Sequence, residues 1–222
     1  MDSNRLTSGP TDARLDSIPA RSRSPVIEIT TITFIGFDPE PSRMEYVVVQ
    51  GDIAAQSADA LVNAAGTSLE MGSGVAGALR RGAGDKINEE AAEKGPIDLG
   101  EVAVTDAYDL NAEYVIHAAA MPHYGDGQAT AESIRDATRN ALEKADELGC
   151  KSLVLPALGC GVAGFDVADG AGIIGEEIEG YEPDSLEDVR FIAYSDEEYD
   201  AIRAATGAAE QSELTDASES ER

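Results

Sequence analysis

The chain has 222 residues, enough for one domain with a full hydrophobic core and too few for two comfortable ones. It carries 43 acidic residues against 16 Lys and Arg, and this net charge of −27 argues against nucleic acid as a partner, because phosphate contacts require a basic face. No run approaches about 20 apolar residues and the start lacks the features of a signal peptide, so we expect a cytoplasmic protein with no membrane partner.

The acidic excess also predicts the salt conditions that suit the protein. Self-repulsion on this scale destabilises a compact state in dilute buffer, whereas at about 1 M salt the Debye length falls to about 3 Å. The acidic composition, scarce lysine and abundant alanine are typical of a halophilic protein, and an ordinary acidic protein is the alternative. The two cysteines, Cys150 and Cys160, fit neither a disulfide framework nor a zinc pattern, so we expect no metal site.

The two ends of the chain differ in composition from its middle. Residues 1–43 form a predicted extension, of which 1 to about 25 are rich in Ser, Pro, Arg and Asp and are expected to be disordered. Within it, "VIEITTITFIGF" (26–37) has the β-branched character of an extra strand; the alternative is that Met44 is the true start, and both stay open. The domain is expected over 44–207, followed by an acidic, Ser-rich, disordered tail over 208–222.

Between these ends, strand and helix patterns alternate. Six short strands are predicted, several of them apolar on both faces: Tyr46–Val49, Ala60–Ala64, Val102–Thr105, Tyr114–Ala118, Leu153–Leu155 and Val189–Tyr194. Five helices are predicted, the third ending at Gly149: Gly74–Gly82, Asp85–Lys94, Ala131–Leu148, Val167–Glu179 and Glu197–Ala205. Apolar strands alternating with helices indicate an α/β fold with a largely parallel sheet covered on both sides. In such sheets, ligands bind beyond the carboxyl ends of the strands.

Two glycine-rich segments fall at such strand ends: "MGSGVAGA" (Met71–Ala78) and "LGCGVAGF" (Leu158–Phe165). Both have the G-x-G-x-x-G spacing. A dinucleotide-binding fold would require the first to follow its strand directly, with an acid about 20 positions on at the end of the next strand. Here six residues separate it from its strand, and the acids at that distance, Glu89, Glu90 and Glu93, belong to a predicted helix. Neither segment carries the Gly-Lys-Ser/Thr ending of a P-loop. Tight turns alone would explain either segment. As a pair, they predict a diphosphate held from both sides by backbone N–H groups and helix dipoles, without Lys or Arg.

Four longer stretches resemble the macrodomain family. "VVVQGDIAAQSADALVNAAGTSLEMGSGVAGALRRGAG" is similar to the family's opening signature, "GEVAVTDAYDLNAEYVIHAAA" and "KSLVLPALGCGVAGF" to its later blocks, and "VRFIAYSDEEYDAI" to its last strand and helix. The resemblance runs in order from about Met44 to Ala205. It implies a three-layer α/β/α macrodomain with a mixed, largely parallel central sheet that binds ADP-ribose as ligand and needs no further cofactor.

The resemblance also implies the residues of the site. Asp52 would accept a hydrogen bond from the adenine amino group, with an N-cap as its alternative. Its expected position is a buried strand end, where the Ile53 N–H would meet the ring. Asn63 would lie near the distal ribose, and Tyr194 would stack on adenine, with a core tyrosine as the alternative. The first phosphate loop would be Gly74, Val75 and Ala76, and the second Gly159, Cys160, Gly161, Val162, Ala163, Gly164 and Phe165.

Three departures from the family pattern bear on catalysis. Gly66 replaces the second Asn of Asn-Ala-Ala-Asn, Ala76 stands where hydrolytic branches commonly have Asp, and Cys160 stands where a small hydroxyl residue is frequent. We therefore expect a binder of ADP-ribose or ADP-ribosyl groups. The rival is an ADP-ribosyl or O-acetyl-ADP-ribose hydrolase, or an ADP-ribose-1″-phosphate phosphatase, and an NAD-dependent dehydrogenase is a third, disfavoured reading. Water positioned by the backbone could still support weak ADP-ribosyl hydrolysis, for which Asn63 and Cys160 are the first residues to test. The two His residues are expected to be structural.

Overall fold

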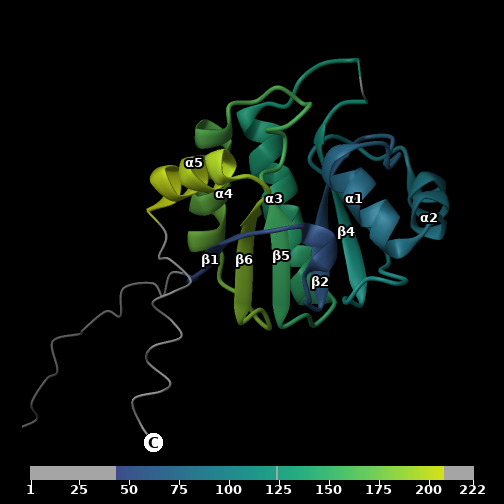
Figure 1. Cartoon of the computed structure of the whole chain (residues 1–222), viewed down its shortest axis with the longest axis horizontal. Helices are drawn as coiled ribbons and strands as arrows, with labels where there is room; N and C mark the ends of the chain where they lie inside the picture. The colour runs from purple at the N-terminus through teal and green to yellow at the C-terminus, as the bar shows by residue number, and fades with distance from the viewer. Residues whose placement is uncertain (1–43, 124, 208–222) are drawn as a thin grey trace, which may run out of the picture. The chain divides into compact units, whose positions relative to one another are not determined.

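The computed structural model describes residues 44–123 and 125–207 (Figure 1). The predicted extension over 1–43, with its strand at 26–37, and the predicted tail over 208–222 lie outside the described residues. The predicted domain over 44–207 is, apart from residue 124, the part that the structure describes.

A mixed six-stranded sheet lies at the centre of the described residues, with strand order β1-β6-β5-β2-β4-β3. The strands are β1 (Val47–Gln50), β2 (Ala60–Gly66), β3 (Val102–Asp106), β4 (Tyr114–Met121), β5 (Ser152–Pro156) and β6 (Asp188–Ala193). All neighbours pair in parallel except β3, which pairs antiparallel with β4 at one edge. The mixed, largely parallel sheet is therefore confirmed, and every predicted strand is present.

The largest error in the strand prediction concerns β4: the sequence predicts its end at Ala118, but it continues to Met121. Alanine has a weak intrinsic preference for strands, so the alanine run at its end indicated no strand. Ala119 and Ala120 are nevertheless buried, and the Ser133 hydroxyl donates to the Ala120 carbonyl at 2.7 Å. Tertiary packing thus extends the strand beyond what local preference indicates.

All five predicted helices are present, with bounds within one residue of the prediction. They are α1 (Gly74–Ala83), α2 (Lys86–Lys94), α3 (Ala131–Glu147), α4 (Val167–Glu179) and α5 (Asp196–Thr206). A capping box begins α3, because the Thr130 and Ser133 side chains each accept a hydrogen bond from the other's backbone N–H. Gly149, at φ +74°, follows the end of α3 as predicted, since a left-handed residue there favours glycine.

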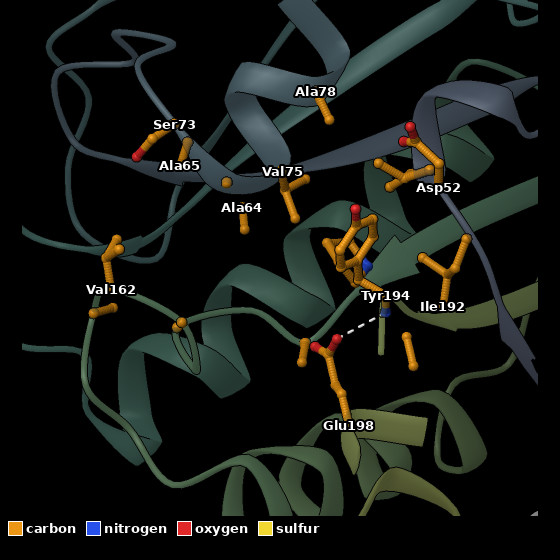
Figure 2. A pocket seen from close by; sticks show the side chains of 18 of the residues that line it. Asp52, Ala64, Ala65, Ser73, Val75, Ala78, Val162, Ile192, Tyr194 and Glu198 are labelled. Atoms are coloured by element: carbon orange, nitrogen blue, oxygen red, sulfur yellow. Dashed lines mark hydrogen bonds between the residues drawn. The ribbon is translucent and has the colours of Figure 1, made fainter. Parts of the chain in front are cut away.

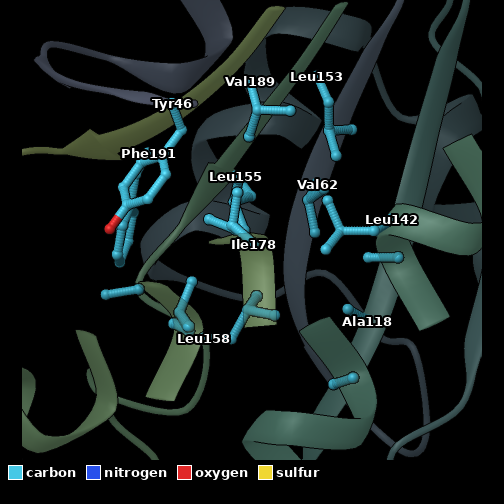
Figure 3. Close-up of a cluster of buried hydrophobic side chains, with 14 of the residues drawn as sticks. Tyr46, Val62, Ala118, Leu142, Leu153, Leu155, Leu158, Ile178, Val189 and Phe191 are labelled. Carbon is cyan, nitrogen blue, oxygen red and sulfur yellow. The ribbon is translucent and has the colours of Figure 1, made fainter. Parts of the chain in front are cut away.

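Helices α3, α4 and α5 cover one face of the sheet. Val62, Leu155 and Phe191 come from three neighbouring strands and point to this face, where Leu142 of α3 and Ile178 of α4 pack against them (Figure 3). Burying each side chain of this size stabilises the fold by about 1.5–3 kcal/mol.

Helices α1 and α2 cover the opposite face, together with a 3₁₀ turn, η1 (Ile53–Ala55) (Figure 1). There Leu61 and Val154 pack with Leu79 of α1 and Ile87 of α2. Successive strand residues point to opposite faces, so each strand feeds both cores. The predicted three-layer α/β/α architecture is confirmed. Over residues 44–123 and 125–207, no helix combines the length and the apolar character needed to cross a membrane.

Candidate functional site

A cavity of about 470 Å³ lies at the carboxyl ends of the parallel strands (Figure 2). Because β1, β2, β4, β5 and β6 run in one direction, these ends meet at one edge of the sheet, where ligands bind in α/β folds. Nine residues predicted for the site line this cavity: Asp52, Ile53, Gly74, Val75, Gly159, Gly161, Val162, Ala163 and Tyr194. Both glycine-rich loops therefore border the same cavity.

The first loop ends in the N-terminus of α1. Ser73 is the N-cap residue but makes no capping hydrogen bond through its side chain, and Gly74 follows with φ +59°, which favours glycine. The Gly77 N–H donates to the Ser73 carbonyl at 3.1 Å. The N–H groups that come before it, at Gly74, Val75 and Ala76, have no carbonyl acceptor within the helix. The positive end of the helix dipole at this position favours an anion.

The second loop is fixed by its packing against α3. Gly159 has φ +75°, and a Cβ atom there would lie 2.8 Å from Ala129 Cβ and 2.9 Å from Ile134 Cγ1. The Ala129 N–H donates to the Ala163 carbonyl at 3.2 Å and ties the loop to the start of α3. By contrast, a Cβ atom on Gly161 would meet nothing within 4 Å. Gly161 therefore presents bare backbone to the cavity.

Asp52 lines the cavity and also caps η1. Its Oδ1 accepts a hydrogen bond from the Ala54 N–H at 2.9 Å, which is the N-cap geometry offered as the alternative role. Capping and ligand binding do not exclude one another, because a carboxylate has further lone pairs. The expectation that Asp52 is buried is wrong: its side chain is exposed because the chain turns to the surface directly after β1.

Tyr194 follows β6 and is 77% exposed, so the alternative of a core tyrosine is wrong. Its ring stands over the cavity, and its backbone N–H donates to Glu198 Oε2 at 2.8 Å (Figure 2). Val162 of the second loop is 72% exposed and also lines the cavity. These two exposed apolar groups are available to contact a ligand.

Asn63 does not line the cavity, although the residues that follow it do. It is 1% exposed, and its Nδ2 lies 3.0 Å from His117 Nδ1. His117 Nε2 in turn lies 3.0 Å from Thr105 Oγ1, and burial lowers the pKa of this imidazole to about 4. Asn63 thus belongs to a buried chain of polar side chains that crosses three strands. His117 lies in the middle of this chain, away from the cavity, as expected of a structural residue.

Cys160 also points away from the cavity. It is 7% exposed, its Sγ donates to the Leu158 carbonyl at 3.3 Å, and the thiol packs under the loop against Gly170 of α4. Burial, reinforced by the nearby negative charges of Glu198 and Asp166, raises the pKa of the thiol to about 12. A thiol that stays protonated is a poor nucleophile. The remaining predicted residues that do not line the cavity are Ala76, Gly164 and Phe165.

Several cavity residues were not predicted from the sequence. Arg81 and Ala78 belong to α1, and Glu198 belongs to α5. The signal for the first two was helical spacing, since positions 74, 78 and 81 share one face of α1. The two loops contain no Lys or Arg, but Arg81 adds a cation to the cavity wall. Among residues 44–123 and 125–207, no group of three or more His, Cys, Asp or Glu is arranged to hold a metal.

Gly66 lies at the bulged end of β2, where the pairing with β4 shifts register. A Cβ atom at this position would lie 2.9 Å from the Pro122 carbonyl oxygen. The chain therefore has no room for a larger residue here unless the backbone moves.

Comparisons with known proteins identify the family to which the sequence is similar. Residues 62–174 match the family described as Macro domain. A protein of Sulfolobus acidocaldarius is 41% identical over 165 residues, which cover 72% of this chain and 89% of that protein. A macro domain-containing protein of Chlorobaculum tepidum is 34% identical over 170 residues, covering 76% and 99%. A Mycobacterium tuberculosis protein is 43% identical over 169 residues but only 46% of it is covered, so this chain spans about half the length of its mycobacterial relatives.

Solved structures resemble the described fold. The Oceanobacillus iheyensis macrodomain with ADP has a TM-score of 0.65 at 26% identity, covering 72% of this chain and 88% of that one. The Trypanosoma brucei macrodomain in complex with ADP-ribose has a TM-score of 0.65 at 27% identity, covering 72% and 68%.

Proposed function

Because this chain belongs to the Macro domain family, we propose that it binds ADP-ribose, either free or attached to another molecule. The observation that carries the proposal is that both glycine-rich loops line one cavity at the carboxyl edge of the sheet. The volume of about 470 Å³ falls within the range of roughly 300–1,000 Å³ typical of small-molecule sites. The ADP-ribose complex of the Trypanosoma brucei macrodomain supports the choice of ligand.

In the proposed arrangement, the diphosphate lies between the two loops. The N-terminus of α1 favours its charge, and the bare backbone at Gly161 allows close approach from the other side. The adenine then lies toward Asp52 and Tyr194, and the distal ribose toward Ala65, at the end of β2.

Calorimetry in multimolar KCl with ADP-ribose, AMP and NAD tests this proposal. We expect ADP-ribose to bind tightest. Asp52→Ala should weaken it by about 1.5–3 kcal/mol through loss of a charged acceptor. Asp52→Asn is the matched control for capping, because Asn remains a good N-cap while removing the charge. Unchanged affinity in both variants would contradict the role of Asp52, and NAD binding as tight as ADP-ribose would favour a dehydrogenase.

The proposal is for a binder rather than a hydrolase. A positioned general base contributes typically 10²–10⁴-fold to a rate, and Gly66 and Ala76 have no polar side chain to position water. Ala76 packs in the core on the α1 side, and Gly66 is confined by the Pro122 carbonyl. A product assay with an ADP-ribosylated carboxylate, O-acetyl-ADP-ribose and ADP-ribose-1″-phosphate should show no release above the spontaneous rate. Steady multiple turnover of any of them would establish the enzyme reading instead.

A further inference from the structure

We infer that Glu198 determines ligand specificity by accepting hydrogen bonds from the hydroxyl groups of the ribose next to the base, so that the cavity selects ribonucleotides. This inference rests on the proposed function, because it requires a nucleoside diphosphate in the cavity.

Glu198 lies in the first turn of α5 and lines the cavity beside Tyr194 (Figure 2). Its Oε2 accepts the hydrogen bond from the Tyr194 backbone N–H at 2.8 Å. Gly161 and Val162 of the second loop line the same cavity as Glu198. In the proposed arrangement Tyr194 contacts the base and the second loop contacts the phosphates. The ribose lies between base and phosphates in every nucleotide, and Glu198 lines the cavity that Tyr194 and the second loop share.

Within the part of the chain that the structure describes, only one carboxylate oxygen of Glu198, Oε2, accepts a hydrogen bond, and Oε1 accepts none. An ionised carboxylate is purely an acceptor, and ribose hydroxyl groups are donors. Dinucleotide-binding folds use an Asp or Glu on a ribose hydroxyl in the same way. Because a carboxylate repels a nearby diphosphate, Glu198 favours only those ligands that donate a hydrogen bond to it.

Helix capping is the structural alternative for Glu198. The side chain stands three residues after the N-cap Ser195, whose hydroxyl accepts a hydrogen bond from the Glu198 N–H at 3.2 Å. A capping role supports the position of Tyr194 and so affects all nucleotides equally. Recognition of the ribose affects only nucleotides that carry its hydroxyl groups. The ratio of the affinities for a ligand with the ribose hydroxyl groups and for one without them therefore separates the two roles.

The test compares ADP-ribose with its 2′,3′-dideoxyadenosine analogue by calorimetry on the full chain, its Glu198→Gln variant and a Glu197→Gln control. Gln keeps the length of the side chain and an oxygen for the Tyr194 N–H. Glu197 is an exposed neighbour in the same helical turn and does not line the cavity, so its variant controls for the loss of one charge. The wild type should prefer ADP-ribose about tenfold or more, and Glu198→Gln should bring the preference to within about twofold. Glu197→Gln should keep the wild-type preference.

Two other results would overturn the inference while leaving the proposed function intact. One is ADP-ribose binding with no preference over the dideoxy analogue. The other is a preference that is the same in Glu198→Gln as in the wild type, even if both affinities fall, because that pattern indicates capping. Absence of binding by both ligands would instead overturn the proposed function, and this inference with it.

Discussion

The two glycine-rich loops have the same spacing, but their glycines meet different requirements. In the first loop, Gly72 has open space and an ordinary backbone, whereas Gly74 needs a positive φ of +59°. In the second loop the order is reversed: Gly159 has φ +75° and is tightly packed, whereas Gly161 is open and needs no positive φ. Equal spacing therefore predicts a loop without indicating which glycine the backbone requires.

The third glycine of each motif shows why the loops differ. Gly77 lies within α1, where a Cβ atom would be 3.1 Å from the Gly72 carbonyl oxygen. Gly164 instead has φ +76° in a closed turn, with its Cβ direction 2.6 Å from Gln128 Nε2. The first loop is thus the start of a helix, and the second is a turn fixed by packing against the segment before α3.

The largest expected effect follows from the packing of the second loop. Gly159→Ala should lower the free energy of unfolding by about 2–5 kcal/mol, from roughly 1–2 for the left-handed backbone and 1–3 for overpacking against Ala129 and Ile134. Gly72→Ala, at the matching position of the first loop, should change it by less than about 0.5 kcal/mol. Denaturant titrations in multimolar KCl measure both. Equal losses at the two positions would show that the loops are alike after all.

The next effect is on binding rather than folding. Gly161→Val should leave the fold intact, because its Cβ direction is open, and should weaken ADP-ribose by about 100-fold or more, equivalent to about 2.8 kcal/mol. The side chain would occupy the space in which backbone and phosphate approach. Gly172→Val on α4 is the matched control, since its Cβ direction is also open but it does not line the cavity. A folded Gly161→Val protein with wild-type affinity would mean that the second loop is only a turn.

The elements could be predicted from the sequence because each is specified locally. Apolar periodicity marks the strands and helices, and Gly149 marks the end of α3 by a conformation that glycine favours. The glycine motifs could also be predicted, because each is one contiguous stretch of sequence. The sequence does not indicate the end of β4, because burial of Ala119 and Ala120 depends on the packed fold and not on the strand preference of alanine.

The rest of the site depends on the packed fold. Arg81 and Glu198 lie on helices, and which side of a helix faces the cavity is set only when the helix docks on the sheet. The constraint on Gly66 comes from Pro122, more than fifty positions away along the chain, across the β2–β4 pairing. No local sequence pattern indicates which side of a helix faces the cavity or that Gly66 lies against Pro122.

A smaller effect is expected in how ADP-ribose affinity depends on salt concentration. The loops present fixed amide donors at short range, which salt screens less than exposed charges, so ADP-ribose affinity should change little as KCl rises within the range where the protein stays folded. Arg81 is the cation on the cavity wall. Arg81→Met should therefore remove most of the remaining dependence of ADP-ribose affinity on salt. Calorimetry across a KCl series measures both slopes. A steep loss of affinity with salt that persists in Arg81→Met would contradict binding through backbone amides.

The smallest effect is expected between the first two glycines of each G-x-G-x-x-G motif. Ser73 holds this position in the first loop and borders the cavity, whereas Cys160 holds it in the second loop and is buried. Cys160→Ala should leave ADP-ribose affinity within about twofold and lower the free energy of unfolding by about 1 kcal/mol, because only a small buried group is lost. Since burial raises the pKa of this thiol to about 12, iodoacetamide should label Cys160 in the unfolded chain and leave it unmodified in the folded one. Peptide mapping after labelling separates Cys160 from Cys150. Rapid labelling of Cys160 in the folded protein, or loss of a measured turnover in Cys160→Ala, would mean that the second loop opens and exposes a reactive thiol. The first loop would then still be the start of a helix, but the second would not be a closed turn.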